Sequence, residues 1–283
     1  MKYLDRDIGR GGDLLVGMAH GPLVPVVLEY RPELIDYVEI AYEQLRHVPQ
    51  SASIQASIPA VLHCASMSVA GFVPPTADTL SAISGEALRM RTPWIGEHLA
   101  FISADRLQDG AASGPISLTY TVCPQLSEQT VDRVVDNTNQ LSAAVPVPII
   151  LENSPLYFQI PGSTMSMTDF IVAVLNKCKA DLLLDLTHFL ITCINTARDP
   201  YRELCRLPLE RVVELHISGI SVQSGIAWDD HASPAPDAIF DMLGIVRERS
   251  RPRAVTFEYN WATNLPVEVL VRQIGRTREL MAA

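Results

Sequence analysis

The feature that most constrains the fold is a repeated alternation of short apolar runs with longer segments of helical spacing. The segments with helical spacing of apolar residues are Gln125–Ala144, Ser166–Lys177, Pro236–Arg249 and Val267–Met281. The first of them contains a Ser127-x-x-Thr130 sequence, which is typical of a helix start. The apolar runs predict eight strands, at residues 14–19, 36–40, 60–63, 94–98, 148–152, 181–185, 212–216 and 254–258. A strand followed by a helix, repeated in this way, predicts an α/β fold of the TIM type, a closed parallel (β/α)8 barrel.

The length of the chain agrees with one such barrel. The chain has 283 residues, and a barrel of this type takes about 250. No low-complexity tract or long linker divides the chain, so we expect residues 1–283 to form a single domain. An open doubly wound sheet is the alternative fold. No GxGxxG turn follows the first predicted strand, so a nucleotide site of that fold is not supported.

The predicted strands end in side chains that can bind a metal. In a barrel the carboxyl ends of the strands meet at one mouth, where functional groups gather. The second strand adds Glu39 near its end, and the seventh is followed by a WDDHAS loop that carries Asp229 and His231. Asn153 and His188 follow two of the strand ends closely. We therefore predict a metal site built on the strand-end residues His63, His98, Glu152, Asp185, His216 and Glu258.

Each of these residues also has a simpler interpretation. A lone buried histidine is usually hydrogen-bonded within the core, and a strand-end aspartate often caps the next helix. We adopt this interpretation for His20 and His47, which stand apart from the pattern. Carboxylates and imidazoles crowded at one mouth would be unfavourable without a shared cation, so the strand-end set favours metal. Glu39 and Asn153 could each bind a metal or orient a ligand.

The types of ligand narrow the choice of metal. Imidazole and carboxylate without thiolate suit iron, manganese or zinc, and the candidates outnumber the ligands of one ion. Two or three ions are therefore expected. Their chemistry could be redox, with iron and dioxygen, or hydrolytic, and ligand identity alone leaves both open.

Charge and cysteine content exclude other classes of protein. A formal net charge of −10 argues against nucleic acid or an anionic membrane as partner. The segment MKYLDRDIGRGG at the amino terminus resembles neither a signal peptide nor a membrane span, so we expect a cytoplasmic protein. The five cysteines are odd in number and lack CxxC spacing, which predicts mostly buried thiols and no disulfide framework.

Seven ordered segments between about Val61 and Trp261 resemble the motifs of a known family. They are LHCASMS, WIGEHLAF, IILENSPLYF, LLLDLTHFLI, VVELHISG, the WDDH loop and TFEYNW. They are similar to the motifs of the multinuclear non-heme iron-dependent oxidative enzymes, formerly domain of unknown function family 692. The resemblance implies a barrel with two or three irons of mixed Fe(II)/Fe(III) state and dioxygen as co-substrate. It also implies a ribosomally made precursor peptide as substrate, often modified at cysteine as in methanobactin biosynthesis, and a partner protein that binds the leader peptide.

Carried over by position, the resemblance gives catalytic roles to Glu152, Asp185 and His216. The family often has asparagine at position 188, an acidic residue at position 260 and glycine at position 64, where this chain has His188, Asn260 and Cys64. The resemblance assigns metal ligation to His63, His98, Glu152, Asp185, His216, Asp229, His231 and Glu258, with Asn153 and His188 as further ligands.

Two rival functions use the same side chains. A zinc or manganese barrel enzyme of the sugar-isomerase or endonuclease-four type would carry out isomerisation or phosphodiester cleavage with a similar ligand set. The order of the motifs argues against both, and the charge argues against the nuclease. A non-catalytic binding protein or scaffold would need the same ligands to be inert.

Overall fold

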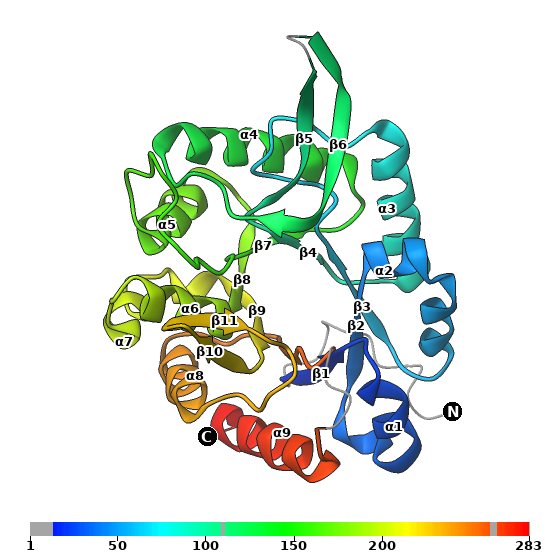
Figure 1. Cartoon of the computed structure of the whole chain (residues 1–283). Helices are drawn as coiled ribbons and strands as arrows, with labels where there is room; N and C mark the ends of the chain where they lie inside the picture. Colours follow the sequence, from blue (N-terminus) through cyan, green and yellow to red (C-terminus); the bar gives the residue numbers. More distant parts are fainter. Residues whose placement is uncertain (1–13, 109–110, 261–264, 283) are drawn as a thin grey trace.

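Eight parallel strands close into a barrel in the order β1-β12-β9-β8-β7-β4-β3-β2, with helices around it (Figure 1). The protein is represented by a computed structural model that describes residues 14–108, 111–260 and 265–282. The predicted (β/α)8 barrel is confirmed, and each strand lies within one residue of its predicted ends. The barrel strands are β1 Leu15–Ala19, β2 Tyr37–Ala41, β3 Ala60–Cys64, β4 Ile95–His98, β7 Ile149–Glu152, β8 Asp181–Asp185, β9 Val212–Ile217 and β12 Ala254–Phe257.

Helices follow every barrel strand before the next one begins. Helix α4 begins after Ser127, whose hydroxyl accepts the Thr130 N–H, as the sequence predicted. Its buried residues Val131, Val134 and Leu141 repeat at helical spacing and face the core. The helices are α1 Leu23–Tyr30, α2 Tyr42–His47, α3 Ala77–Met90, α4 Glu128–Ala144, α5 Met167–Lys177, α6 Leu186–Asn195, α7 Pro200–Leu204, α8 Asp237–Arg249 and α9 Val267–Ala282, with 3-10 turns at Pro32–Leu34, Pro49–Ala56 and Leu209–Arg211.

Two antiparallel hairpins interrupt the alternation, and the sequence did not predict them. Strands β5 (Phe101–Gln108) and β6 (Ala111–Val122) lie between β4 and α4, and their hairpin extends away from the barrel in Figure 1. Strands β10 (Ile220–Gln223) and β11 (Ile226–Asp229) lie between β9 and α8. Both hairpins follow the carboxyl end of a barrel strand and therefore belong to the functional mouth.

The second hairpin corrects one expectation. Asp229 was expected in an irregular loop, but it is the last residue of β11. The turn consists of Ser224 and Gly225, which both have positive φ, at 52° and 79°. This backbone is the one that a two-residue hairpin turn requires, and its twist matches that of the flanking strands. Only His231 lies beyond the hairpin, where the chain leaves regular structure.

The amino-terminal half of the barrel interior contains a closed polar network. The Glu214 carboxylate accepts hydrogen bonds from Trp94 Nε1 at 2.6 Å, Thr256 Oγ1 at 2.7 Å and the Tyr37 hydroxyl at 3.0 Å. All four side chains are fully buried, and Val61, Ile150 and Leu183 pack with the two aromatic rings. The network satisfies a buried carboxylate and fills the barrel below its mouth.

Two expectations concern the ends of the chain and membranes. Residues 1–12, on which the targeting prediction rests, lie outside the described residues. In the part of the chain that the structure describes, no helix combines the length and the apolar character needed to cross a bilayer.

All five cysteines are free, and Cys64, Cys178 and Cys193 are buried, as expected for most of them.

Candidate metal centre

The barrel brings the ten predicted site residues to one place. Neighbouring strands set His98 beside Glu152 and Asp185 beside His216 as register partners. Because the strands are parallel, all their carboxyl ends lie at the same mouth of the barrel. The register between neighbouring strands therefore brings together residues that are far apart in the sequence. His98 and Asp229 are partly buried, whereas the other eight are buried: His63, Glu152, Asn153, Asp185, His188, His216, His231 and Glu258.

Glu152 lies at the centre of this group. Its Oε2 is 3.1 Å from His63 Nε2 and 3.2 Å from His98 Nε2. Its Oε1 is 3.2 Å from His188 Nδ1 and 3.8 Å from His216 Nδ1. The two oxygens of one carboxylate therefore face two different pairs of histidines, which is the geometry of a bridging carboxylate.

Asp185 combines the two roles that the sequence left open. Its Oδ1 accepts the backbone N–H of His188 at 2.6 Å and caps helix α6, which stabilises the helix start. Its Oδ2 is 3.5 Å from His188 Nδ1 and has no hydrogen-bond partner. The cap uses one oxygen and leaves the other for the centre. On the neighbouring strand, His216 Nδ1 lies 3.4 Å from Glu258 Oε2.

The β10–β11 hairpin and the residues that follow it contribute further side chains to the centre. Asp229 Oδ2 lies 3.1 Å from His188 Nε2 and also contacts His231 Nε2, while Asp229 Oδ1 accepts the Ser218 hydroxyl at 2.9 Å. His231 has a φ of 48°, a conformation that side-chain contacts must hold in place. Asn260 Oδ1 lies 2.9 Å from His231 Nδ1 and orients that ring. The roles of Ser218 and Asn260 were not predicted from the sequence, although both follow strand-end ligands by two residues.

Asn153 is held by backbone at both ends of its amide. Its Nδ2 donates to the Asp185 carbonyl at 3.0 Å, and its Oδ1 accepts the Asp185 N–H at 2.9 Å. The carbonyl of Asn153 lies 3.0 Å from His188 Nδ1. This arrangement is that of the orienting alternative, because the amide fixes the backbone of Asp185.

The unpaired atoms of the centre provide a test of whether these residues fit a metal. Each buried polar atom without a partner costs roughly 1–3 kcal/mol. In three groups of these residues, and in a fourth that joins Glu39 to His63 and His216, ligand atoms lie within 4.8 Å of one another, and nitrogen and oxygen are their only donor types. The residues therefore fit ions such as iron, manganese or zinc. The unpaired buried atoms facing this space are Glu152 Oε2, Asp185 Oδ2, His216 Nδ1 and Glu258 Oε2.

Burial and neighbouring charges shift the pKa values of the groups in the centre. Burial alone would lower the pKa of His63, but the charges of Glu39 and Glu152 outweigh it and raise the pKa to about 10. Burial raises the pKa of Asp185 to about 7 against the opposing effect of His188. Burial lowers the pKa of His98. An ion that binds here must displace protons from the histidines, so binding is linked to proton release.

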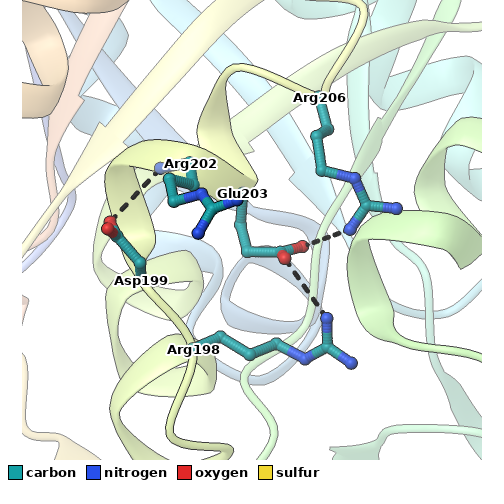
Figure 2. A pocket seen from close by; sticks show the side chains of 5 residues that line it. All are labelled: Arg198, Asp199, Arg202, Glu203 and Arg206. Carbon is teal, nitrogen blue, oxygen red and sulfur yellow. Dashed lines mark hydrogen bonds and ion pairs between the residues drawn. The ribbon is translucent and has the colours of Figure 1, made fainter.

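A second polar cluster lies away from this centre. A pocket at α7 is lined by Arg198, Asp199, Arg202, Glu203 and Arg206 (Figure 2). The Glu203 carboxylate accepts from Arg198 at 3.2 Å and from Arg206 at 2.7 Å. None of the predicted site residues lines this pocket. Its Arg198 and Arg206 pair with Glu203, and its Asp199 caps α7.

Comparison with known proteins identifies the family of the chain. Residues 17–282 match the sequence model of the family described as RiPP precursor modification enzyme MbnB/TglH/ChrH, in which RiPP denotes a ribosomally synthesised and modified peptide. The chain belongs to this family.

The individual relatives of this MbnB/TglH/ChrH family member share about a quarter of its aligned residues. A UPF0276 protein of Streptomyces avermitilis is 28% identical over 276 residues, which cover 95% of this chain and 55% of the relative. The chain thus spans about half the length of that relative. A UPF0276 protein of Caulobacter vibrioides is 25% identical over 236 residues, which cover 82% of this chain and 81% of the relative.

Solved structures share the fold of this MbnB/TglH/ChrH family member. D-psicose 3-epimerase from Clostridium cellulolyticum has a TM-score of 0.59 and 12% identity, with 95% of this chain and 98% of that chain covered. Endonuclease IV from Thermus thermophilus has a TM-score of 0.57 and 14% identity, with 95% and 99% covered. At these identities the likeness shows the barrel fold alone.

The room left for the His63 ring gives a first prediction for this family member. A Cβ at Gly96 would contact the His63 ring, with Cε1 at 3.1 Å, and Leu183 Cδ1 at 2.9 Å. Gly96→Ala should therefore displace the ring, lower the free energy of unfolding by roughly 1–3 kcal/mol, and reduce the amount of divalent metal bound per chain. Urea denaturation and metal analysis measure both.

Gly85→Ala is the matched control. A Cβ at Gly85 meets nothing within 4 Å, and the residue lies inside helix α3. This variant should bind divalent metal as the wild type does and should be equally or more stable. A Gly96→Ala protein with full metal binding would show that the position of the His63 ring does not matter for metal binding.

Proposed function

We propose that this protein is a multinuclear non-heme iron enzyme that uses dioxygen to modify a ribosomally made precursor peptide, at a cysteine. The observation that carries the proposal is Glu152, whose two buried oxygens face separate groups of histidines 3.1–3.8 Å away. A carboxylate in this position offsets the repulsion between two adjacent cations. Membership of a family of RiPP precursor modification enzymes supports a peptide as the substrate.

The proposed ligands fall into three groups, of which the first two share Glu152. His63 and His98 with Glu152 would hold one ion, and Glu152 with Asp185, His216 and Glu258 a second. His188, Asp229 and His231 would hold a third. Two or three irons of mixed Fe(II)/Fe(III) state are therefore proposed, with Glu152, Asp185 and His216 as the residues closest to the chemistry. Asn153 is assigned the orienting role, because both ends of its amide bind Asp185.

Iron bound at these groups would supply the redox chemistry, in which dioxygen accepts the electrons that the peptide cysteine loses. The protein contributes position and burial. Hydrogen bonds to Asp185, Asp229 and His231 fix the ligands before the ions bind, which limits reorganisation. The His98 side chain is 18% exposed, against 10% or less for the other histidines of the centre, so we propose that the peptide approaches from the His98 side.

Further parts of the proposal concern the setting of the enzyme. A partner protein would bind the leader peptide, and the protein would act in the cytoplasm. The zinc or manganese alternative uses the same donors, and its chemistry would be isomerisation or phosphodiester cleavage. The net charge of −10 disfavours DNA as the substrate of such an enzyme.

The choice of metal is the direct test of the redox proposal. Protein loaded anaerobically with Fe(II) should retain more than one iron per chain and should consume dioxygen only when its cognate peptide is added. Zinc-loaded protein should bind metal and leave the peptide unchanged. Metal analysis, an oxygen electrode and mass spectrometry of the peptide measure these quantities. Full activity of zinc-loaded protein without oxygen uptake would refute the proposal.

The ligands differ in how firmly the fold holds them. His216 is fully buried on barrel strand β9, whereas His231 follows the β10–β11 hairpin. Hairpins and loops open more readily than core strands, so the ion near His231 should exchange most easily. His231→Ala should lose this ion alone. His216→Ala should lose the ion assigned to Glu152, Asp185 and Glu258. It should also weaken the neighbouring ion that Glu152 contacts, so its effect should be larger than that of His231→Ala.

Iron per chain and Mössbauer spectra during a graded chelator challenge distinguish the two variants. The wild type under the same challenge is the reference for the order in which ions leave. If His231→Ala retains the full complement of iron, Asp229 and His231 are not ligands and serve the structure of the hairpin instead.

A further inference from the structure

Glu39 on strand β2 lies between two histidines of the proposed centre. It is 3% exposed, and its Oε2 is 3.1 Å from His216 Nε2 and 3.8 Å from His63 Nδ1. The rings of the two histidines are 5.5 Å apart and tilted by 52°. A single carboxylate oxygen thus faces one nitrogen of each ring. The strand register explains its place, because Glu39 pairs with Val61 of β3, two residues before His63.

Each ring turns its other nitrogen toward the centre. His63 Nε2 lies 3.1 Å from Glu152 Oε2, and His216 Nδ1 lies 3.4 Å from Glu258 Oε2. An imidazole that binds a metal does so through one nitrogen and carries its proton on the other. When the nitrogens that face the centre bind metal, the protons of both rings lie on the nitrogens that face Glu39.

We propose that Glu39 is a positioning residue shared by two ligand histidines that belong to different ions. Its carboxylate accepts the Nε2–H of His216 directly and attracts the Nδ1–H of His63 across the longer gap. It therefore fixes opposite tautomers, with the proton on Nε2 of His216 and on Nδ1 of His63. A carboxylate that accepts from a ligand imidazole raises its basicity and fixes the ring orientation. This inference rests on the proposed function only in that both rings bind metal.

The competing role for Glu39 is that of a direct ligand. Its carboxylate, His63 and His216 offer atoms within 4.8 Å of one another, which would suffice for an additional ion. Such an ion would need both rings to lose their second proton and to bind metal at both nitrogens. A hydrogen bond from the ring needs no second deprotonation, and the 3.1 Å separation between Glu39 Oε2 and His216 Nε2 lies within the range of N–H···O hydrogen bonds.

The first test replaces the carboxylate by an amide. Glu39→Gln removes the charge and places an NH2 group beside a ring proton, so it can serve at most one of the two histidines. Fe(II)-loaded protein, challenged with increasing chelator, should release two ions at concentrations about 10 to 100-fold lower than the wild type. Iron per chain before the challenge should be unchanged. Metal analysis and Mössbauer spectra follow the release.

Glu97→Gln is the matched control. Glu97 is a fully buried carboxylate on strand β4 whose Oε2 accepts the Met67 N–H at 3.1 Å, a contact that glutamine can keep. This variant should release iron as the wild type does. Glu39→Gln overturns the inference if it releases iron like Glu97→Gln. It also does so if it lacks one whole ion from the start while the others keep wild-type affinity.

The second test uses the wild-type chain, so it does not depend on the folding of a variant. In zinc-loaded protein with 15N-labelled histidine, NMR should show a proton on Nε2 of His216 and on Nδ1 of His63. A proton missing from either of these nitrogens overturns the inference. If the wild type binds neither Fe(II) nor zinc, the proposed function fails. If it binds both metals without the predicted tautomers, the role of Glu39 alone fails.

Discussion

The structure depends on how a barrel mouth accommodates buried carboxylates and imidazoles that lie in direct contact. Glu152, Asp185 and His216 are almost without exposure, and an ionised group in such a place needs a partner of opposite charge. Without metal these groups can only share protons among themselves, which leaves several oxygens and nitrogens unpaired. Shared cations would satisfy the same atoms at once. The barrel supplies the rigidity that makes such close placement possible.

The surroundings of the centre follow from this constraint. Below it, Glu214 has donors from Trp94, Thr256 and Tyr37, so the next buried carboxylate in the barrel is satisfied. Around it, Asn153 fixes the backbone of Asp185. At the mouth itself, the two hairpins follow β4 and β9, the strands that carry His98 and His216. Barrel strands thus fix most of the ligands, whereas the β10–β11 hairpin supplies Asp229 from a part of the fold that opens more easily.

Those parts of the fold that depend on local pattern could be predicted from the sequence. Apolar runs indicated the eight strands, and the rule that parallel strands end together predicted that His98 and Glu152 share one mouth. The second hairpin was not predicted because β10 and β11 have only four residues each and the two-residue turn at Ser224 and Gly225 was not recognised. The first was not predicted because the sequence of β5 includes Asp-Arg and that of β6 includes Gly-Pro, which interrupt an apolar strand pattern. Which nitrogen of His216 faces Glu39 depends on packing between distant strands, and a sequence pattern does not carry that information.

The central claim is that metal ions, and not protons, hold this cluster together, with Glu152 between two of them. X-ray diffraction from crystals of the Fe(II)-loaded protein, recorded on both sides of the iron absorption edge, tests this most directly. The account predicts at least two anomalous peaks that flank Glu152, one beside His63 and His98 and one beside Asp185 and Glu258. A map without an iron peak at this mouth, in which the carboxylates and histidines contact one another directly, would contradict it.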